Sequence, residues 1–429
     1  MFIPPVTPDE VLSAVERIDN NKTPGLDGIP NRVLKVAMKN HTDLFCCLYT
    51  TCFNEGVFPN SWKRQRLVLI PKGNKPPEHP SSYRPLCMLD TIGKIFERII
   101  SNRIEHHSDE VGAISNQQYG FRKRRSTTDA ISAVCNIGRE AMRGKRWLGG
   151  TKKYCAVITL DVKNAFNSAN WAIITNILRD IETPKYLLNI INSYFTDRVL
   201  LYDTSDGPKK YTVTSGVPQG SVLGPLLWNL MYDGILRVRR PPGVSIIGYA
   251  DDIAVTVVAK TTDEIISRSE EIISIAKNWL ESVGLQLAEH KTEAVLLSSR
   301  KKVETITIKI GDHFITSKPN IKYLGVTLDH RLNFRDHLTN AANKAKKVGV
   351  HLARLMPNIG GPRQRSRRLI ASVCNSIMLY VAPIWHQAFN CVSYIGECKS
   401  AYRISSLRVC SAYRTVSYDA SSGNDLQMA

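Results

Sequence analysis

Two stretches of the chain combine apolar, β-branched residues with acidic residues at one end. Residues 154–160 read Tyr-Cys-Ala-Val-Ile-Thr-Leu, a nearly unbroken apolar run typical of a buried strand, and Asp161 follows directly. Residues 245–258 contain two apolar, β-prone runs separated by Tyr249-Ala250-Asp251-Asp252. This pattern predicts a β-hairpin that carries two adjacent carboxylates at its tip.

Apolar residues at helical spacing occupy much of the remaining chain. Amphipathic patterns predict helices over residues 7–19, 33–53, 91–104, 171–178, 187–195, 222–236 and 263–283, and a further helix from Ser126. Additional strands are predicted at 66–72, near 211–214, at 285–297 and at 321–328. This order of strands, helices and hairpin predicts an α+β fold with a mostly antiparallel sheet.

The C-terminal part of the chain combines helical spacing with basic residues. From Asp336 onward, apolar residues line one side of a predicted helix and lysines at 344, 346 and 347 line the other. An arginine cluster at 363–368 precedes a second helix, whose predicted apolar face consists of Leu369, Ile370, Val373, Ile377 and Val381. A basic helical lobe of this kind suits the phosphate backbone of a nucleic-acid duplex.

Composition and charge narrow the class of partner. The chain has 429 residues, of which 43% are hydrophobic, and this length suits two or three lobes around a large core. The formal net charge is +19, and the basic residues cluster at 122–125, 143–146, 237–240, 300–302, 344–347 and 363–368. Six basic clusters favour a surface that binds a polyanion, with nucleic acid as the leading partner.

The cysteines and the apolar runs predict neither a secreted protein nor a membrane span. The ten cysteines form no Cys-x-x-Cys pair and no Cys/His cluster with zinc spacing, and the N-terminus does not resemble a secretory leader. No apolar run approaches the roughly 20 residues that a membrane helix requires. We therefore expect reduced thiols in a cytosolic or nuclear protein that does not bind a membrane.

The acidic residues admit a catalytic and a structural interpretation. A carboxylate at the end of a buried strand costs several kcal/mol unless it is compensated, and a metal ion compensates it directly. Three carboxylates on neighbouring strands can hold two divalent cations about 4 Å apart, which is the arrangement that transfers nucleotidyl groups. Alternatively, Asp161 caps the following turn, and Asp251 and Asp252 are ordinary turn residues.

Several motifs together resemble those of reverse transcriptases. Asp161, the Gln219-Gly220 loop and Tyr249-Ala250-Asp251-Asp252 resemble motifs A, B and C of that family. Residues 22–30, 83–86, 118–122, 284–292 and 322–326 look like the remaining blocks of the subclass found in retrotransposons without long terminal repeats. Residues 352–362 and 379–385 look most like type-1 insect elements that insert into ribosomal RNA genes. The resemblance covers about residues 7–390.

The resemblance implies a right-hand polymerase and assigns roles to its matched residues. The metal ligands would be Asp161, Asp251 and Asp252, which would hold two Mg²⁺ ions, with Mn²⁺ as the alternative metal. Lys72 and Arg84 would clamp the triphosphate, assisted by the backbone of Asn164 and Ala165. Phe166 would exclude the ribose 2′-hydroxyl, and the substrate-contacting set would be completed by Gln219, Gly220 and Lys291. The expected partners are an RNA template, a DNA primer or target, and deoxynucleoside triphosphates.

The same resemblance implies an organisation and leaves alternatives. We expect an N-terminal extension and fingers at 1–150, a palm with part of the fingers at 151–330, a helical thumb at 331–415 and a disordered tail at 416–429. The endonuclease and Cys/His regions of full-length relatives are not expected in these residues. Synthesis in the cytoplasm and action in the nucleus follow from the proposed target. An RNA-dependent RNA polymerase, an intron maturase and a catalytically decayed nucleic-acid-binding remnant remain alternatives.

Overall fold

The computed structural model describes residues 3–73, 76–143, 152–300 and 304–417, and these residues form an α+β fold. The helices are α1 (Pro8–Glu16), α2 (Asn31–Asn40), α3 (Thr42–Glu55), α4 (Thr91–Glu110), α5 (Thr127–Met142), α6 (Trp171–Asp180), α7 (Lys185–Phe195), α8 (Gly224–Leu236), α9 (Thr262–Ser282), α10 (Arg335–Ala353), α11 (Gln364–Met378), α12 (Ala382–Trp385) and α13 (Val392–Val409). The strands are β1 (Arg64–Pro71), β2 (Tyr83–Met88), β3 (Tyr154–Leu160), β4 (Val199–Thr204), β5 (Gly207–Thr212), β6 (Val244–Tyr249), β7 (Asp252–Ala259), β8 (Glu293–Leu297), β9 (Thr307–Ile310), β10 (His313–Thr316), β11 (Asn320–Tyr323) and β12 (Val326–Asp329).

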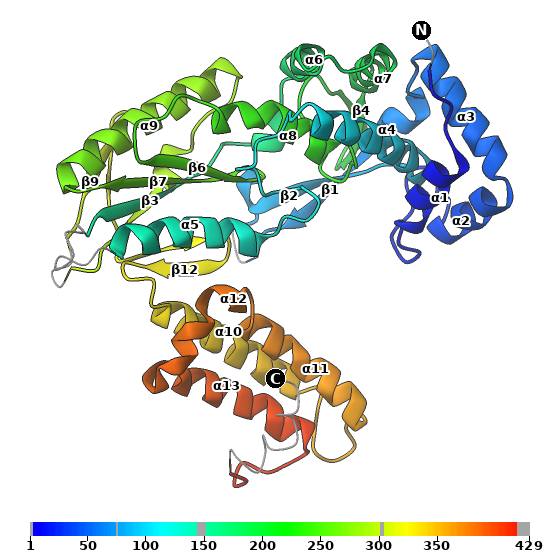
Figure 1. Cartoon of the computed structure of the whole chain (residues 1–429). Coiled ribbons are helices and arrows are strands. Elements are labelled where there is room, and N and C mark those ends of the chain that lie inside the picture. Colours follow the sequence, from blue (N-terminus) through cyan, green and yellow to red (C-terminus); the bar gives the residue numbers. More distant parts are fainter. Residues whose placement is uncertain (1–2, 74–75, 144–151, 301–303, 418–429) are drawn as a thin grey trace.

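A four-stranded antiparallel sheet, which we call the central sheet, lies at the middle of the molecule (Figure 1). Its strand order is β6-β7-β3-β8, with Leu160 of β3 opposite Ile253 of β7. This register places Asp161, the residue after β3, beside Asp252, the first residue of β7. The hairpin β6–β7 closes at Ala250 and Asp251, as the sequence predicts.

The central sheet separates two hydrophobic cores. Side chains alternate between the faces of a strand, so that Ala156 and Ile158 of β3 join one core while Cys155 and Val157 join the other. Helices α8 and α9 cover the first face, and α5 covers the second. Because both faces are covered, β3 is buried almost throughout, which explains its unbroken apolar sequence.

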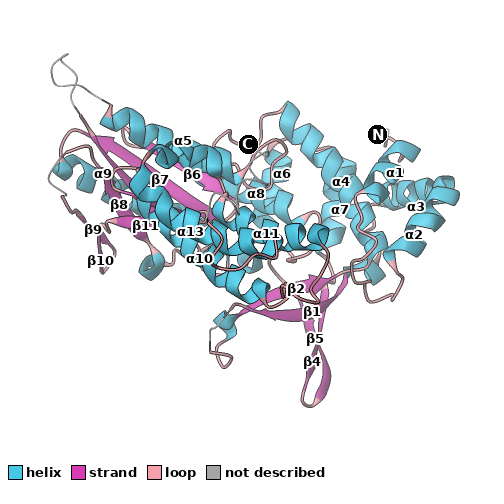
Figure 2. Cartoon of the chain, turned by 90° about the horizontal axis from the view of Figure 1, so that it is seen from below, coloured by secondary structure: helices cyan, strands magenta, loops and turns pink. Residues whose placement is uncertain are grey.

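A second four-stranded sheet, the outer sheet, has the order β2-β1-β4-β5. Strands β1 and β2 are antiparallel, with Ile70 opposite Arg84, and β4 joins β1 in parallel. The β4–β5 hairpin extends away from the body of the molecule (Figure 2). The sequence predicts only a strand near 211–214, because most β5 side chains are exposed and show no apolar alternation.

Helices α10 to α13 form a C-terminal helical lobe next to the central sheet (Figure 1). The predicted apolar face of the helix at α11 is only partly correct: Ile377 and Val381 join the core, whereas Leu369 and Val373 are exposed. The buried residues of α11 are Arg367, Ala371, Cys374 and Met378. Arg367 is buried because its guanidinium donates hydrogen bonds to the carbonyls of Met356, Pro357, Pro362 and Arg408. Apolar periodicity does not predict this burial, because it expects an aliphatic residue at a buried position of the helix.

Three features of the described residues bear on the remaining predictions from sequence. None of the ten cysteines, all of which lie in the described part of the chain, forms a disulfide. Among the described helices, no single one is long and apolar enough to cross a membrane, although the bent pair 364–378 and 382–390 passes that test together by length and composition. Residues 144–146 and 301–302 of the basic clusters and nearly all of the predicted tail lie outside the described residues.

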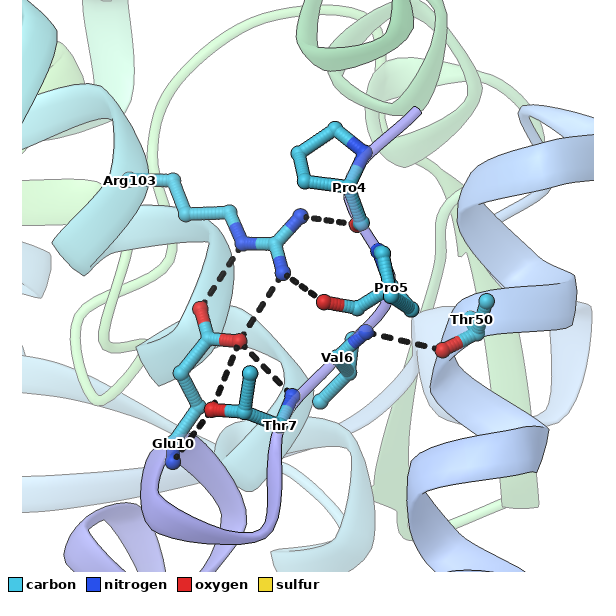
Figure 3. Close-up of polar contacts among 7 residues, drawn as sticks. All are labelled: Pro4, Pro5, Val6, Thr7, Glu10, Thr50 and Arg103. Atoms are coloured by element: carbon cyan, nitrogen blue, oxygen red, sulfur yellow. Dashed lines mark hydrogen bonds and ion pairs between the residues drawn. The ribbon is translucent and has the colours of Figure 1, made fainter. Parts of the chain in front are cut away.

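The N-terminal helices α1 to α3 pack against α4. The segment 33–53 is helical as predicted, but it forms two helices, α2 and α3, which are separated at His41 with φ −129°. Thr7 and Glu10 form a capping box that starts α1 at Pro8. Figure 3 shows that Glu10 also pairs with Arg103 of α4, with Nε to Oε1 at 2.8 Å.

Arg103 joins the N-terminal segment to α4. Its guanidinium donates hydrogen bonds to the carbonyls of Pro4 and Pro5, both at 3.0 Å (Figure 3), and lies over the ring of Phe53 at 4.7 Å. The side chains of Arg103 and Glu10 are only 12% and 25% exposed. Although burial raises the pKa of Glu10, hydrogen bonds from Arg103 and Thr7 lower it overall. The pair is therefore a partly buried charge contact.

We predict that Arg103→Ala lowers the free energy of unfolding by about 2 to 4 kcal/mol, because it removes the cation paired with Glu10 and the donors to two carbonyls. The loss should shrink as pH falls through the depressed pKa of Glu10, since protonation of that carboxyl already weakens the pair in the wild-type chain. The measurement is urea unfolding at pH 7 and at pH 3.5. Arg66→Ala is the control, because the Arg66–Asp203 pair at 2.7 Å is 55% and 66% exposed. Equal effects of the two substitutions would contradict the prediction.

Candidate active site

Buried polar contacts hold the tip of the β6–β7 hairpin. Ala250 has φ +59°, a left-handed conformation that a residue with a Cβ rarely adopts. The fully buried Gln118 side chain accepts a hydrogen bond from the Ala250 amide at 3.1 Å. The Tyr232 hydroxyl donates to the Asp251 carbonyl at 3.3 Å. These contacts fix the tip backbone and leave its carboxylates free to face the cleft.

The segment before α5 packs directly under the same tip. A Cβ on Gly120 would lie 2.1 Å from the Ala250 nitrogen, so only glycine fits at that position. The Tyr119 amide donates to the Gly248 carbonyl at 2.8 Å. Gln118, Gly120 and Tyr232 are therefore supporting residues to which the sequence assigned no role. Gln118 and Gly120 belong to the Gln118-Tyr119-Gly120 motif, which the sequence analysis singled out. The motif does not reveal that these residues contact the hairpin tip.

The carboxylates influence one another electrostatically. Asp252 keeps contact with solvent, yet the protein packed around its carboxyl group and the charges of Asp251 and Asp161 raise its pKa to about 6. Burial, followed by the charge of Asp161, raises the pKa of Asp251. The Nζ atom of Lys291 lies 2.6 Å from Oδ2 of Asp161. The positive charge of Lys291 thus partly offsets the negative charge of the carboxylates.

A cavity of about 1340 Å³ lies against this edge of the central sheet and reaches the outer sheet. It brings together ten of the eleven residues that the sequence nominates, namely Lys72, Arg84, Asp161, Asn164, Ala165, Phe166, Gln219, Gly220, Asp251 and Lys291. Asp252 lies instead on a smaller cavity of about 340 Å³, which shares Asp161 and Lys291 with the first. The three carboxylates therefore stand at the boundary between two cavities.

Apart from Lys291, two cations line the large cavity, and they lie at the neighbouring ends of β1 and β2. Arg84 is paired with Ile70 across the strands, and Lys72 follows β1 by one residue. The Lys72 amide donates to the Ser82 carbonyl at 2.7 Å, which holds the two strand ends together. Both cationic side chains belong to exposed residues, so they remain hydrated and available to an anion in the cavity.

Another part of the cavity wall is formed by the turn at Asn164 to Phe166 and by the loop that contains Gly220. Asn164 has φ +49° and begins the turn that contains Phe166. The Phe166 ring packs on Trp228 with centroids 4.9 Å apart. Gly220 has φ +121°, and a Cβ there would lie 2.6 Å from the Cys87 carbonyl oxygen. This wall is therefore rigid, and the ring position of Phe166 is set by Trp228.

The chemistry of the donor set suits a divalent cation. The described residues contain no group of three or more His, Cys, Asp and Glu side chains already placed to hold a metal ion. The three aspartates nevertheless offer only carboxylate oxygens, the ligands that hard dications prefer, and their mutual effect on pKa shows a site that positive charge stabilises. The ammonium group of Lys291 supplies part of that charge in this structure.

Comparisons with known proteins agree with this geometry. A family profile described as "Reverse transcriptase (RNA-dependent DNA polymerase)" matches residues 70–328. A putative 115 kDa protein in the type-1 retrotransposable element R1DM of Drosophila melanogaster is 29% identical over 95% of this chain and 39% of its own length. The Pol polyprotein of a type-1 retrotransposable element R1 of Bradysia coprophila is 28% identical over 96% of this chain and 40% of its own length. The chain thus spans about two fifths of these relatives.

The resemblance and the fold class predicted from the sequence are confirmed by these matches. Polymerases of this family depend in general on a divalent metal. Among solved structures, telomerase from Candida tropicalis in complex with a fragment of telomeric RNA matches with a TM-score of 0.46 and 12% identity, over 90% of this chain and 64% of that one. The domain boundaries predicted from the sequence and the roles of individual site residues stay predictions.

We predict that Asp252→Asn raises the melting temperature of the metal-free chain at pH 7.5 by roughly 1 to 3 °C. The pKa of the Asp252 carboxyl in the folded chain is about 6, above the value of 3.8 that is ordinary for aspartate. Such a carboxyl destabilises the fold progressively as pH rises between these two values. The gain from the amide should therefore be complete above pH 6 and absent below pH 4. Calorimetry with a chelator measures it. Exposed Asp206→Asn is the control and should show no such pH dependence; a destabilised Asp252→Asn at pH 7.5 would contradict the argument.

Proposed function

Because the chain belongs to the reverse transcriptase (RNA-dependent DNA polymerase) family, we propose that it extends a DNA 3′-hydroxyl on an RNA template, using deoxynucleoside triphosphates. The observation that carries the proposal is the large cavity, which has two carboxylates of the central sheet at one end and two cations of the outer sheet at the other. This arrangement suits a triphosphate whose α-phosphate faces Asp161 and Asp251. The relatives support a setting in a retrotransposon without long terminal repeats, with synthesis primed at the target DNA.

The chain's own residues have separable tasks in this reaction. Asp161, Asp251 and Asp252 would hold two Mg²⁺ ions, or Mn²⁺ in their place, which lower the pKa of the primer hydroxyl and stabilise the leaving pyrophosphate. Lys72 and Arg84 bind the β- and γ-phosphates by charge-assisted hydrogen bonds. Lys291, whose ammonium group contacts Asp161, would donate a proton to pyrophosphate at the end of the reaction.

The cavity wall selects the sugar and orients the base. The Phe166 ring packs on Trp228 and lines the cavity, and in our proposal it would exclude a ribose 2′-hydroxyl. The backbone of Asn164 and Ala165 offers polar atoms to the triphosphate, and Gln219 and Gly220 lie beside the nucleotide and template. The bulk of Phe166 favours DNA synthesis over the RNA polymerase alternative.

The remaining alternatives and the cellular setting are proposals of the same standing. A catalytically decayed remnant has no reason to retain three mutually repelling carboxylates with their supporting contacts, so we favour an active enzyme. An intron maturase shares the polymerase chemistry, and the type-1 relatives favour the retrotransposon instead. We propose synthesis in the cytoplasm and action in the nucleus, where the target DNA lies.

We predict that Asp251→Asn lowers primer extension by about three orders of magnitude or more, because a lost metal ligand removes several kcal/mol of transition-state stabilisation. The measurement is extension of a DNA primer on an RNA template with Mg²⁺, beside a binding assay for the same duplex. Binding should persist, since Asp251 is one of three carboxylates and not a phosphate contact. Asp206→Asn, an exposed aspartate on the outer hairpin, is the control. An active Asp251→Asn variant would overturn the two-metal mechanism.

We predict that Phe166→Val increases the use of ribonucleotides relative to deoxynucleotides by about tenfold or more, because the smaller side chain opens space for the 2′-hydroxyl. The measurement is the ratio of kcat/KM values for each nucleotide type on the same primer–template. Phe121→Val is the control, since Phe121 also lines the cavity and lies 6.0 Å from the Phe166 ring centroid. Unchanged sugar selectivity in Phe166→Val would count against a steric gate.

A further inference from the structure

A buried carboxylate lies behind the cavity wall, outside the set of residues used so far. Glu97 belongs to α4 and is 1% exposed. Its Oε2 atom accepts hydrogen bonds from the backbone amides of Val222 at 2.6 Å and Leu223 at 3.3 Å. These residues immediately precede α8 and follow the Gln219-Gly220 loop. A side chain 125 residues away in sequence thus binds the end of that loop.

Glu97 acts as a remote cap for α8. The first amides of a helix lack partners within the helix, and the helix dipole favours negative charge at that end. The N-cap residue of α8 is Leu223, which provides no side-chain hydrogen bond. Ser221 provides a local acceptor for the Gly224 amide, whereas Glu97 provides the acceptor for the Val222 and Leu223 amides and a carboxylate at this helix end.

Glu97 lies in a buried cluster of charged and polar groups. Burial raises the pKa of Glu97 overall, although the buried cation Arg198, the two backbone amides and Lys94 act to lower it. Arg198 is itself 0% exposed and stacks on Tyr194 at 4.3 Å. This interior cluster of charges is costly to bury, and an apolar residue at 97 would avoid that cost. The cluster therefore indicates a positional requirement.

The loop that Glu97 holds is the part of the cavity wall that carries Gln219. At its other end, the Cys87 amide of β2 donates to the Gln219 carbonyl at 2.8 Å. Between them, Ser221 Oγ donates to the Pro218 carbonyl at 2.9 Å and accepts from the Gly224 amide at 3.0 Å. Gln219, Gly220 and Ser221 all line the large cavity. Each of these contacts is made to the loop backbone, and no hydrogen bond or ion pair of the Gln219 side chain is found within the described part of the chain.

We propose that Glu97 is a positioning residue for nucleotide binding: its buried carboxylate fixes the backbone of residues 217–223 and so directs Gln219 toward the incoming nucleotide and template. This inference rests on the proposed function for the role of Gln219. The hold of Glu97 on the loop backbone does not depend on that function, and it is measured separately.

The first experiment uses Glu97→Gln, which keeps the shape of the side chain and removes its charge. Hydrogen exchange of the Val222 and Leu223 amides should accelerate by about tenfold, and the KM for deoxynucleotides should rise by about tenfold, with kcat and the primer–template Kd changed less than about threefold. The matched control is Asp233→Asn, another buried carboxylate, which accepts from the Ser115 amide at 2.6 Å and does not contact the loop. It should change neither the exchange at 222–223 nor the KM.

A second experiment separates positioning from a general loss of stability. In a Gln219→Ala background, Glu97→Gln should add nothing to the KM, because the side chain that it directs is gone. Additive effects on KM, or unchanged exchange at Val222 and Leu223 in Glu97→Gln, would overturn the proposal. Glu97→Asp keeps the charge at shorter reach and should give intermediate exchange and KM, which keeps the test open if the Gln variant unfolds. If the wild-type chain extends no primer, the proposed function fails, while the exchange result still decides whether Glu97 holds the loop.

Discussion

The repulsion among three carboxylates at one edge of the central sheet is the constraint on which the rest of the structure depends. Asp161, Asp251 and Asp252 reach the same place because β3 and β7 are paired with Leu160 opposite Ile253. Burial, and then the charges of the neighbouring carboxylates, raise the pKa values of Asp251 and Asp252, so the arrangement opposes folding at neutral pH. The apolar sheet, which is buried on both faces, supplies the frame, and Lys291 supplies a local cation.

The cleft is held mainly by side chains that bind distant backbone. Gln118 holds the amide of Ala250 at the hairpin tip, and Glu97 holds the amides at the end of the Gln219 loop. In each case the supporting side chain is buried and the contact is made to the backbone of the held segment. Backbone support has a physical advantage at such a site, because it fixes position without using the groups that bind substrate. It also explains why glycine is required at Gly120, where the backbones approach too closely for a Cβ.

What the sequence predicts well is what local pattern determines. The strand before Asp161 and the hairpin at Asp251 follow from apolar runs of the right length. The resemblance of several motifs to those of reverse transcriptases nominated the ten residues that one cavity brings together. The supporting contacts were not predictable, because the partners of Gln118 and Glu97 lie 132 and 125 residues away and no periodicity records them. The apolar face of α11 was only partly predicted for a related reason, since Arg367 is buried against four carbonyls that come from other segments. The break at His41 was not predicted, because a single non-helical residue leaves the apolar spacing on both sides intact.

The same kind of backbone contact links the C-terminal helical lobe to the carboxylates. The Tyr380 hydroxyl, at the end of α11, donates to the Leu324 carbonyl at 3.0 Å, in the turn between β11 and β12. A Cβ on Gly325 would lie 3.0 Å from the Tyr380 ring, so the glycine permits this close approach. Leu324 and Gly325 line the smaller cavity together with Asp161 and Asp252. The helical lobe is therefore held relative to the carboxylates partly through this turn, together with the packing of α10 on β12 and of α12 on α5.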